Sequence, residues 1–326
     1  MPNLPTPPSI PGVTWRHATR ADAPAIAALQ DICFAVDDTY REVESEILGR
    51  WSDPNIEMES DSLLAVTDSG DVVVSLWSVV PTVAETKWRA FGLNYVHPDY
   101  RRDHYMGISH IWWETRARQR ISAKAGDLPG VMSFIAYEQE MGKLAFLEAN
   151  GYAISRYFDE MFRDLSLPLP DKDLPASVTL VPSDDADDGD ELMVHNASFA
   201  DHWGSQPFSQ ARWDLLKDEF YLPDASFVAY DGDVPVGQIL CAKYPHDFEA
   251  RGFSHSWVEA LGVVRSHRKM GLASAMIAVV FERFVADGME YAAIGVDAEN
   301  PTGAYGLYEG LGFKKVRRSM SMQKPI

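Results

Sequence analysis

The chain has 326 residues, of which 46% are apolar and 24% charged, and its formal net charge is −19. This length suffices for two domains, and the apolar fraction excludes an intrinsically disordered protein. The negative charge argues against a nucleic-acid partner, because binding to phosphates requires a basic surface.

An acidic surface would attract a cationic substrate such as an amine, although it also serves solubility alone. No apolar run approaches the roughly 18 residues that a membrane-spanning helix requires, so no membrane partner is expected. Residues 1–12 are rich in proline and lack the basic and apolar segments of a signal peptide. We therefore expect them to form a flexible tail, and we expect a cytoplasmic protein.

The two cysteines, Cys33 and Cys241, are far apart in the sequence and lie in apolar surroundings. Cytoplasmic proteins rarely carry structural disulfides, so both are expected to be buried free thiols. No group of cysteines and histidines has the spacing of a zinc site, and we therefore predict no metal.

Three sequence landmarks occur twice in the same order, at offsets close to 165 residues. The paired segments are 13–23 with 178–187, 96–101 with 263–268, and 148–152 with 309–313. Repetition in register indicates a duplicated domain. We predict an N-terminal domain at 13–164, a proline-stiffened linker at 165–176 and a C-terminal domain at 177–326.

Each copy contains the pattern of a β-hairpin. Runs of strand-forming residues at 63–67 and 72–80 flank a turn of Asp and Gly residues, and runs at 226–230 and 234–242 do the same. In each copy a strand, a long helix and another strand follow. This order predicts a mixed α/β fold.

A strand at 258–263 leads into the segment Arg268–Ala273, which opens a long helix ended by Gly288. In that helix Leu272, Met276, Val279, Val280 and Phe284 share one face. A strand at 291–296 comes next.

The turn before the helix combines backbone N–H groups with the positive end of the helix dipole, and this combination can bind a pyrophosphate. Gly271 would let the main chain approach the ligand, and Arg268 and Lys269 could add cationic contacts. Such a turn on its own is more often a simple helix start. It has neither the ending of a Walker loop nor the three-glycine spacing of a dinucleotide site.

A second short helix is predicted after the strand at 291–296. Asn300 suits its N-cap, Pro301 its first turn, and Gly312 the position after its end. Three glycines within it weaken the helix and would let a ligand or backbone come close.

Together these motifs resemble the GNAT N-acetyltransferase superfamily. The strand ending Leu261-Gly262-Val263, the string Arg268-x-x-Gly271-x-Ala273 and the segment from Asn300 through Tyr308 to Gly312-Phe313 stand in that family's order and spacing. The resemblance covers nearly all of the second copy and, more loosely, the first. The tandem layout is similar to that of the mycothiol synthases, whose chemistry lies in the second domain, but we infer no substrate from it.

The resemblance implies two tandem domains, each a mixed, mostly antiparallel sheet flanked by helices, and acetyl-CoA as co-substrate. The positions that it assigns to the coenzyme are Leu261, Gly262, Val263, Arg268, Lys269, Met270, Gly271, Leu272, Ala273, Asn300 and Tyr305. A strand amide would polarise the thioester carbonyl. Tyr308 corresponds to the general acid that protonates the departing thiolate.

The general base is left between Glu259 and Asp297. The mycothiol synthases carry their acidic residue two positions before Glu259, where this chain has Trp257, and other members have Glu where Gly295 stands. Glu259 is favoured because alternation along a strand places it on the same face as position 257.

His202 and Trp203 lie where the family's early helices cover the acceptor, so they are expected to contact substrate, although a packed Trp and an exposed His are equally compatible. The first copy has His104 at the position of Gly271 and Leu147 at the position of Tyr308. A leucine cannot donate a proton, so the first copy is expected to give structural support or residual coenzyme binding without turnover.

The leading hypothesis is an acetyl-CoA-dependent N-acetyltransferase acting on a primary amine of a small molecule or peptide. The alternative is a non-catalytic coenzyme A-binding sensor or scaffold. A nucleotide-binding domain would instead show competition between ATP and coenzyme A. The acceptor and the oligomeric state stay open, because acceptor pockets are built from variable loops.

Overall fold

A computed structural model describes residues 4, 6–101, 104–124, 126–300 and 303–326. The chain divides into two compact units. Unit 1 comprises Met1–Arg156 and Ser319–Ile326, and unit 2 comprises Tyr157–Arg318. Most of the first copy's last strand therefore belongs to unit 2, and the end of the second copy's last strand belongs to unit 1.

The strands of unit 1 follow the order β1-β2-β3-β4-β5-β12. Their bounds are β1 Val13–Arg16, β2 Ser62–Thr67, β3 Val72–Val79, β4 Trp88–Val96, β5 Gly130–Tyr137 and β12 Lys314–Pro325. Only β4 and β5 pair in parallel among these neighbours, and the others pair antiparallel. The predicted hairpin at 63–67 and 72–80 is confirmed by β2 and β3.

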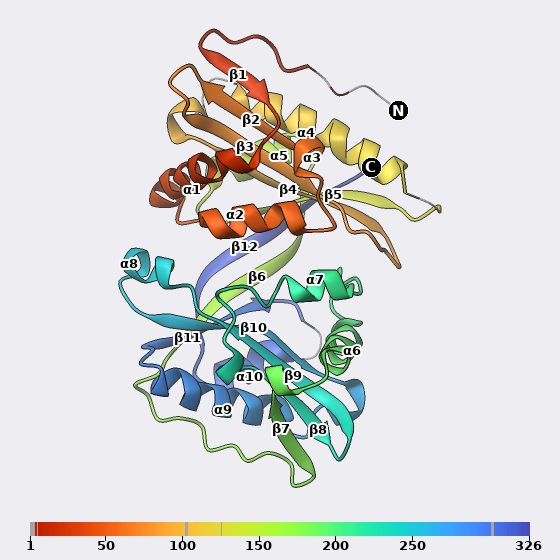
Figure 1. The fold of residues 1–326 in the computed structure, drawn as a ribbon, viewed down its shortest axis with the longest axis vertical. Coiled ribbons are helices and arrows are strands. Elements are labelled where there is room, and N and C mark those ends of the chain that lie inside the picture. The colour runs from red at the N-terminus through yellow and green to blue at the C-terminus, as the bar shows by residue number, and fades with distance from the viewer. Residues whose placement is uncertain (1–3, 5, 102–103, 125, 301–302) are drawn as a thin grey trace. The chain divides into compact units, whose positions relative to one another are not determined.

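Helices cover both faces of this sheet (Figure 1). They are α1 Ala23–Asp37, α2 Glu44–Gly49, α3 Met58–Asp61, α4 Tyr105–Ser122 and α5 Met141–Ala149. Successive residues of β2 point to opposite layers: Leu64 joins the core beneath α1, and Ala65 joins the core beneath α4.

The strands of unit 2 follow the order β6-β11-β10-β9-β8-β7. Their bounds are β6 Ala153–Asp164, β7 Val178–Pro182, β8 Phe227–Asp231, β9 Val234–Ala242, β10 His255–Val263 and β11 Tyr291–Asp297. Only β10 and β11 pair in parallel in this series. Both units thus have the predicted mixed, mostly antiparallel α/β architecture.

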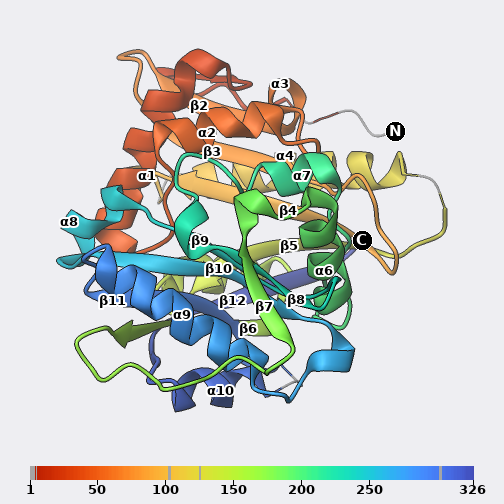
Figure 2. The ribbon, with the colours of Figure 1, turned by 60° about the horizontal axis from the view of Figure 1, so that its bottom comes forward.

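The helices of unit 2 are α6 Asp188–Phe199, α7 Gln210–Asp214, α8 Phe248–Arg251, α9 Leu272–Ala286 and α10 Ala304–Gly310. Helix α9 runs along β9, β10 and β11 (Figure 2), and α6 packs on β9 and β10. The predicted apolar face of α9 is confirmed: Leu272, Met276, Val280 and Phe284 are at most 1% exposed, and Val279 packs against the same core. Full burial of such side chains stabilises by roughly 1.5–3 kcal/mol each.

Two features near the ends of the second copy differ from the sequence-based expectations. Segment 165–176, predicted as a linker, is attached to unit 2, because Leu165, Leu169 and Leu174 pack against its core. Helix α10 begins at Ala304 with Gly303 as its N-cap, so the prediction of Asn300 as N-cap is wrong. Pro301 lies outside the described residues.

Both cysteines are buried free thiols, as predicted. Within the described part of the chain, no helix combines the length and apolarity needed to cross a membrane.

Candidate active site

A cavity opens where β10 and β11 separate. The two strands pair only from His255 with Tyr291 to Val258 with Ile294. Beyond this point a cavity of about 680 Å³ is lined by both strands, the loop before α9, the first turn of α9, the end of α6 and helix α10. Its volume is in the range of small-molecule and cofactor sites.

Most of the predicted site residues line this one cavity. They are His202, Glu259, Leu261, Gly262, Val263, Arg268, Lys269, Gly271, Leu272, Ala273, Asp297, Asn300 and Tyr308. Met270, Trp203 and Tyr305 are not among its lining residues. Met270 is 53% exposed, and the Tyr305 hydroxyl donates instead to Asp159 at 3.1 Å.

Glu259 is the extra residue of a β-bulge. The register between β10 and β9 shifts there, since Val258 opposes Cys241 and Ala260 opposes Leu240. A bulge interrupts the alternation of side chains, and the argument that Glu259 shares the face of Trp257 therefore fails.

The core beneath α9 shows the effect of the bulge. Val258, Leu261 and Val263 all contact this core, which a strand of period two could not achieve. Gly262 faces the opposite layer, where an added Cβ would lie 2.1 Å from the Ser198 hydroxyl oxygen. Gly262 is therefore required by the close approach of α6 to the strand.

The start of α9 offers free backbone donors to the cavity. No described residue accepts a hydrogen bond from the amides of residues 270–274. Gly271 is the N-cap with φ 83°, and nothing lies within 4 Å of where its Cβ would stand. Lys269 also has a positive φ, 64°, which helps to curl the loop before the helix. A pyrophosphate fits these donors and the helix dipole.

The side chain of Arg268 is engaged within the protein. Its Nε donates to the Val263 carbonyl at 3.1 Å, Nη2 to the Ser198 carbonyl at 2.9 Å, and Nη1 to Asp201 at 3.2 Å. The expected cationic contact from this guanidinium to a phosphate is therefore not supported. Hydrogen bonds from Arg265 and Arg268 hold the pKa of Asp201 below its usual range.

Tyr308 lies on α10 in the cavity wall and is 8% exposed. No described residue forms a hydrogen bond with its hydroxyl, and its ring packs edge-on against Phe313 at 5.9 Å. Burial raises the pKa of Tyr308 to about 12. The phenol is therefore fully protonated at neutral pH and available as a donor.

The two candidate bases occupy different strands. Glu259 Oε1 accepts a hydrogen bond from the Tyr244 hydroxyl at 3.0 Å. Glu259 is exposed, and the protein atoms packed around its carboxylate displace enough water to raise its pKa. Asp297 ends β11, and its Oδ1 accepts from the Glu299 amide at 3.0 Å.

His202 approaches Asp297, with Nε2 at 4.0 Å from Oδ2. Its neighbour Trp203 points its ring toward Phe158 of β6, at 6.3 Å between centroids. The sequence did not single out Tyr244 or Ser198. Nothing in their local pattern marks them, because Tyr244 becomes relevant through the loop after β9 and Ser198 through the packing of α6.

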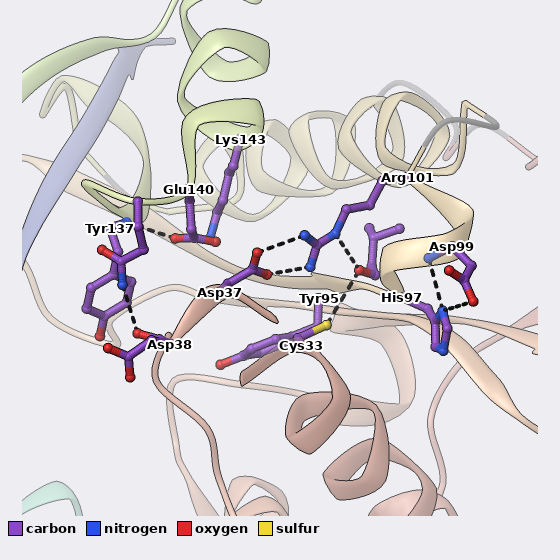
Figure 3. A network of polar contacts seen from close by, with 12 residues as sticks. Cys33, Asp37, Asp38, Tyr95, His97, Asp99, Arg101, Tyr137, Glu140 and Lys143 are labelled. Carbon is purple, nitrogen blue, oxygen red and sulfur yellow. Dashed lines mark hydrogen bonds and ion pairs between the residues drawn. The ribbon is translucent and has the colours of Figure 1, made fainter. Parts of the chain in front are cut away.

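Unit 1 has the same backbone arrangement before its long helix, but different side chains at the positions that correspond to Gly271 and Tyr308. His104 is the N-cap of α4 with φ 67°, the counterpart of Gly271. Arg101 donates from Nε to the Val96 carbonyl at 3.0 Å. Its other guanidinium nitrogens donate to Asp37, as Figure 3 shows. Leu147 on α5 is 2% exposed.

The strand register of unit 1 differs as well. The pairing of β3 with β4 runs from Val74 with Val96 to Val79 with Phe91 without a shift, so β4 lacks the bulge of β10. The absence of the bulge, the imidazole at position 104 and the leucine at position 147 support the expectation that unit 1 does not catalyse.

Comparison with known proteins agrees with this geometry. Residues 193–313 match the model of the Acetyltransferase (GNAT) family. The mycothiol acetyltransferase of Salinispora arenicola is 30% identical over 234 residues, covering 70% of this chain and 71% of the relative. The chain therefore belongs to the GNAT acetyltransferase family.

Solved structures show the same fold. A GCN5-related N-acetyltransferase from Sphaerobacter thermophilus superposes with a TM-score of 0.72 at 23% identity, covering 97% of this chain and 96% of that one. A tandem GNAT protein from the clavulanic acid biosynthesis pathway gives a TM-score of 0.70 at 15% identity, with 96% and 98% coverage.

Proposed function

We propose that unit 2 transfers an acetyl group from acetyl-CoA to a primary amine of a small molecule or peptide. The observation that carries the proposal is the Tyr308 hydroxyl, which lines the cavity without a partner among the described residues. The same cavity contains the free amides at the start of α9. The names of the relatives support acetyl as the transferred group.

The amides of residues 270–274 would bind the coenzyme diphosphate, with Lys269 adding a cation. After Val258, β10 stays paired with β9 but no longer with β11, and this open edge would bind the pantetheine arm as an added strand. One amide of Leu261, Gly262 or Val263 would donate to the thioester carbonyl oxygen as charge develops on it.

In the reaction, the neutral amine nitrogen attacks the thioester carbonyl carbon, the C–N bond forms and the C–S bond breaks. The departing sulfur takes the Tyr308 proton. The phenolate then recovers a proton from the nitrogen that has become the amide, which leaves the enzyme unchanged. A protonated phenol in a water-poor wall suits this role.

The test is release of free thiol from acetyl-CoA with a panel of primary amines, with acetyl-CoA affinity measured by calorimetry. Tyr308→Phe should lower kcat by about 10²-fold or more while the Kd for acetyl-CoA changes less than about threefold. Tyr230→Phe, which removes a hydroxyl bonded to Asp190 in the same unit, is the matched control.

Tight binding of acetyl-CoA without thiol release for any amine would indicate a coenzyme A-binding sensor or scaffold. Full turnover by Tyr308→Phe would remove the tyrosine from the mechanism.

A further inference from the structure

We infer that the His202 imidazole, with Asp297 beside it as a positioning residue, accepts the proton that the acceptor ammonium must lose before attack. This inference rests on the proposed acetyltransferase function. It concerns the step before acyl transfer, because an alkyl ammonium has a pKa near 10 and is not a nucleophile until it is deprotonated.

The first support is position. His202 follows α6 and Asp297 ends β11, and both line the cavity that contains Tyr308. The His202 amide donates to the Phe199 carbonyl at 2.8 Å, and its ring packs 5.6 Å from that of Phe199. The amide of Ser205 donates to the His202 carbonyl at 3.1 Å. Backbone hydrogen bonds to Phe199 and Ser205 therefore hold the segment that carries the imidazole.

The second support is the burial of the carboxylate. The side chain of Asp297 is 1% exposed, whereas that of His202 is 28% exposed. An ionised carboxylate at such depth gains from a nearby positive charge. At 4.0 Å the pair is too far apart for a direct hydrogen bond. The carboxylate therefore acts mainly through its charge, and its effect is greatest once the imidazole becomes a cation.

The competing candidate base is Glu259, on the bulge of β10. Its carboxylate accepts the Tyr244 hydroxyl at 3.0 Å, and loss of surrounding water raises its pKa although this hydrogen bond acts in the opposite direction. Glu259 is exposed, whereas the carboxylate beside His202 is buried. A comparison of His202 and Glu259 variants therefore decides between the two bases.

Two carboxylates of different elements lie close to His202 in space or in sequence. Asp297 comes from β11. Asp201 precedes His202 but is paired with Arg265 at 2.6 Å and Arg268 at 3.2 Å. Asp297 faces the imidazole, with its Oδ2 4.0 Å from Nε2.

The protons balance as follows. The acceptor ammonium transfers one proton to His202 and becomes the neutral amine. That amine forms the C–N bond, and the second exchanged proton passes through Tyr308 as described above. The imidazolium releases its proton to water after the product leaves, so each turnover yields one amide, one thiol and one proton.

The experiment measures kcat/KM against pH for the full chain with acetyl-CoA and whichever amine the wild type accepts. His202→Gln and His202→Asn should each lower kcat/KM about 10²-fold or more, with the Kd for acetyl-CoA nearly unchanged. The acidic limb of the profile should disappear in both. Asp297→Asn should lower the rate and move that limb to lower pH, because the imidazolium loses its stabilising charge.

Two controls make the result specific. His97→Gln removes the histidine of a pair of similar separation, 3.9 Å from Asp99, in unit 1 (Figure 3) and should leave the profile unchanged. Added imidazole should restore part of the activity of His202→Gly, which a purely structural role would not allow.

If His202→Gln and His202→Asn keep kcat/KM within about threefold, or if Glu259→Gln alone abolishes the acidic limb, the inference is overturned. A wild type that binds acetyl-CoA but acetylates no amine would refute the proposed function itself, and this outcome is distinguishable from the other two.

Discussion

Arg268 in unit 2 and Arg101 in unit 1 make the same contact: each donates its Nε hydrogen to the carbonyl oxygen five positions earlier, at 3.1 and 3.0 Å. Each guanidinium also binds an aspartate near the end of the first long helix of its unit. The contact occurs whether the loop carries Gly271 or His104. It therefore belongs to the fold of the unit and fixes the end of a strand.

Replacing Arg268 by Met should reduce both stability and coenzyme affinity. The substitution removes hydrogen bonds to two carbonyls and one carboxylate, with an expected loss of about 1–3 kcal/mol in the free energy of unfolding. Arg101→Met should destabilise similarly and leave the Kd for acetyl-CoA unchanged. Urea unfolding and calorimetry measure the two effects. Unchanged affinity in a stable Arg268→Met protein would show that this strand end does not position the coenzyme.

The sequence was sufficient for the local parts of the fold. The hairpins β2–β3 and β8–β9 are confirmed. They were predictable because a short Asp/Gly turn makes the two strands beside it pair with each other. The apolar face of α9 is confirmed because its spacing of three and four residues depends on one helix alone.

Features that depend on non-local partners were not predictable. The bulge at Glu259 is defined only by its pairing with β9, and alternation along one strand cannot reveal it. The direction of the Arg268 side chain depends on α6, which lies about 70 residues earlier. The candidate pair of His202 and Asp297 likewise joins two elements far apart in the chain.

Gly271→Ala should weaken acetyl-CoA binding by about tenfold or more. An alanine at φ 83° is strained by about 1–2 kcal/mol, and its methyl group would enter the open space beside the helix start. Gly288→Ala is the matched control: it has φ 76°, also lacks neighbours within 4 Å and lies at the other end of α9. Equal losses of affinity in both variants would mean that backbone strain is responsible, and not an altered binding site at the start of α9.

Gly262→Ala should destabilise unit 2 even when no ligand is present. Its Cβ would lie 2.1 Å from the Ser198 oxygen and 2.9 Å from the Ser198 Cβ, and overpacking of this kind costs about 1–3 kcal/mol. Adding Ser198→Gly should recover part of the loss. Gly295→Ala, on the neighbouring strand with nothing within 4 Å, should be tolerated in urea unfolding. Failure of the double substitution to recover stability would argue against this packing.

The stability of unit 2 should fall as the pH is lowered from 7 to 5. Burial, and secondarily the Arg212 charge, lower the pKa of His195 to about 4. The unfolded chain binds the proton below about pH 6.5 while the folded chain does so only near pH 4, so stability is lost between these values. The expected loss at pH 5 is about 2 kcal/mol in urea unfolding. Burial also lowers the pKa of His255, which acts in the same direction.

His195→Gln isolates the contribution of this histidine. The variant keeps a polar group near Gln238, whose Nε2 lies 2.9 Å from His195 Nδ1. Its stability should change less between pH 7 and pH 5 than that of the wild type. An identical slope in both proteins would assign the pH dependence to other groups.

Removing residues 319–326 should unfold unit 1 selectively. In β12, Ser319–Pro325 pair with β5 from Tyr137 to Val131, and Met320 and Met322 are 6% and 0% exposed. Their loss leaves β5 with an open edge and takes two buried side chains from the core. Hydrogen exchange should become fast in β2 and β3 of unit 1 and stay slow in β9 and β10 of unit 2. Acetyl-CoA binding should persist, because the cavity lies wholly in unit 2.

Met322→Ala is the milder version of the same change, with an expected loss of about 2–5 kcal/mol confined to unit 1. Slow exchange in β2 and β3 after the truncation would show that the C-terminal segment is dispensable for unit 1. Loss of acetyl-CoA binding together with unit 1 would instead mean that unit 2 needs unit 1 to fold, because every residue lining the cavity remains in the truncated chain.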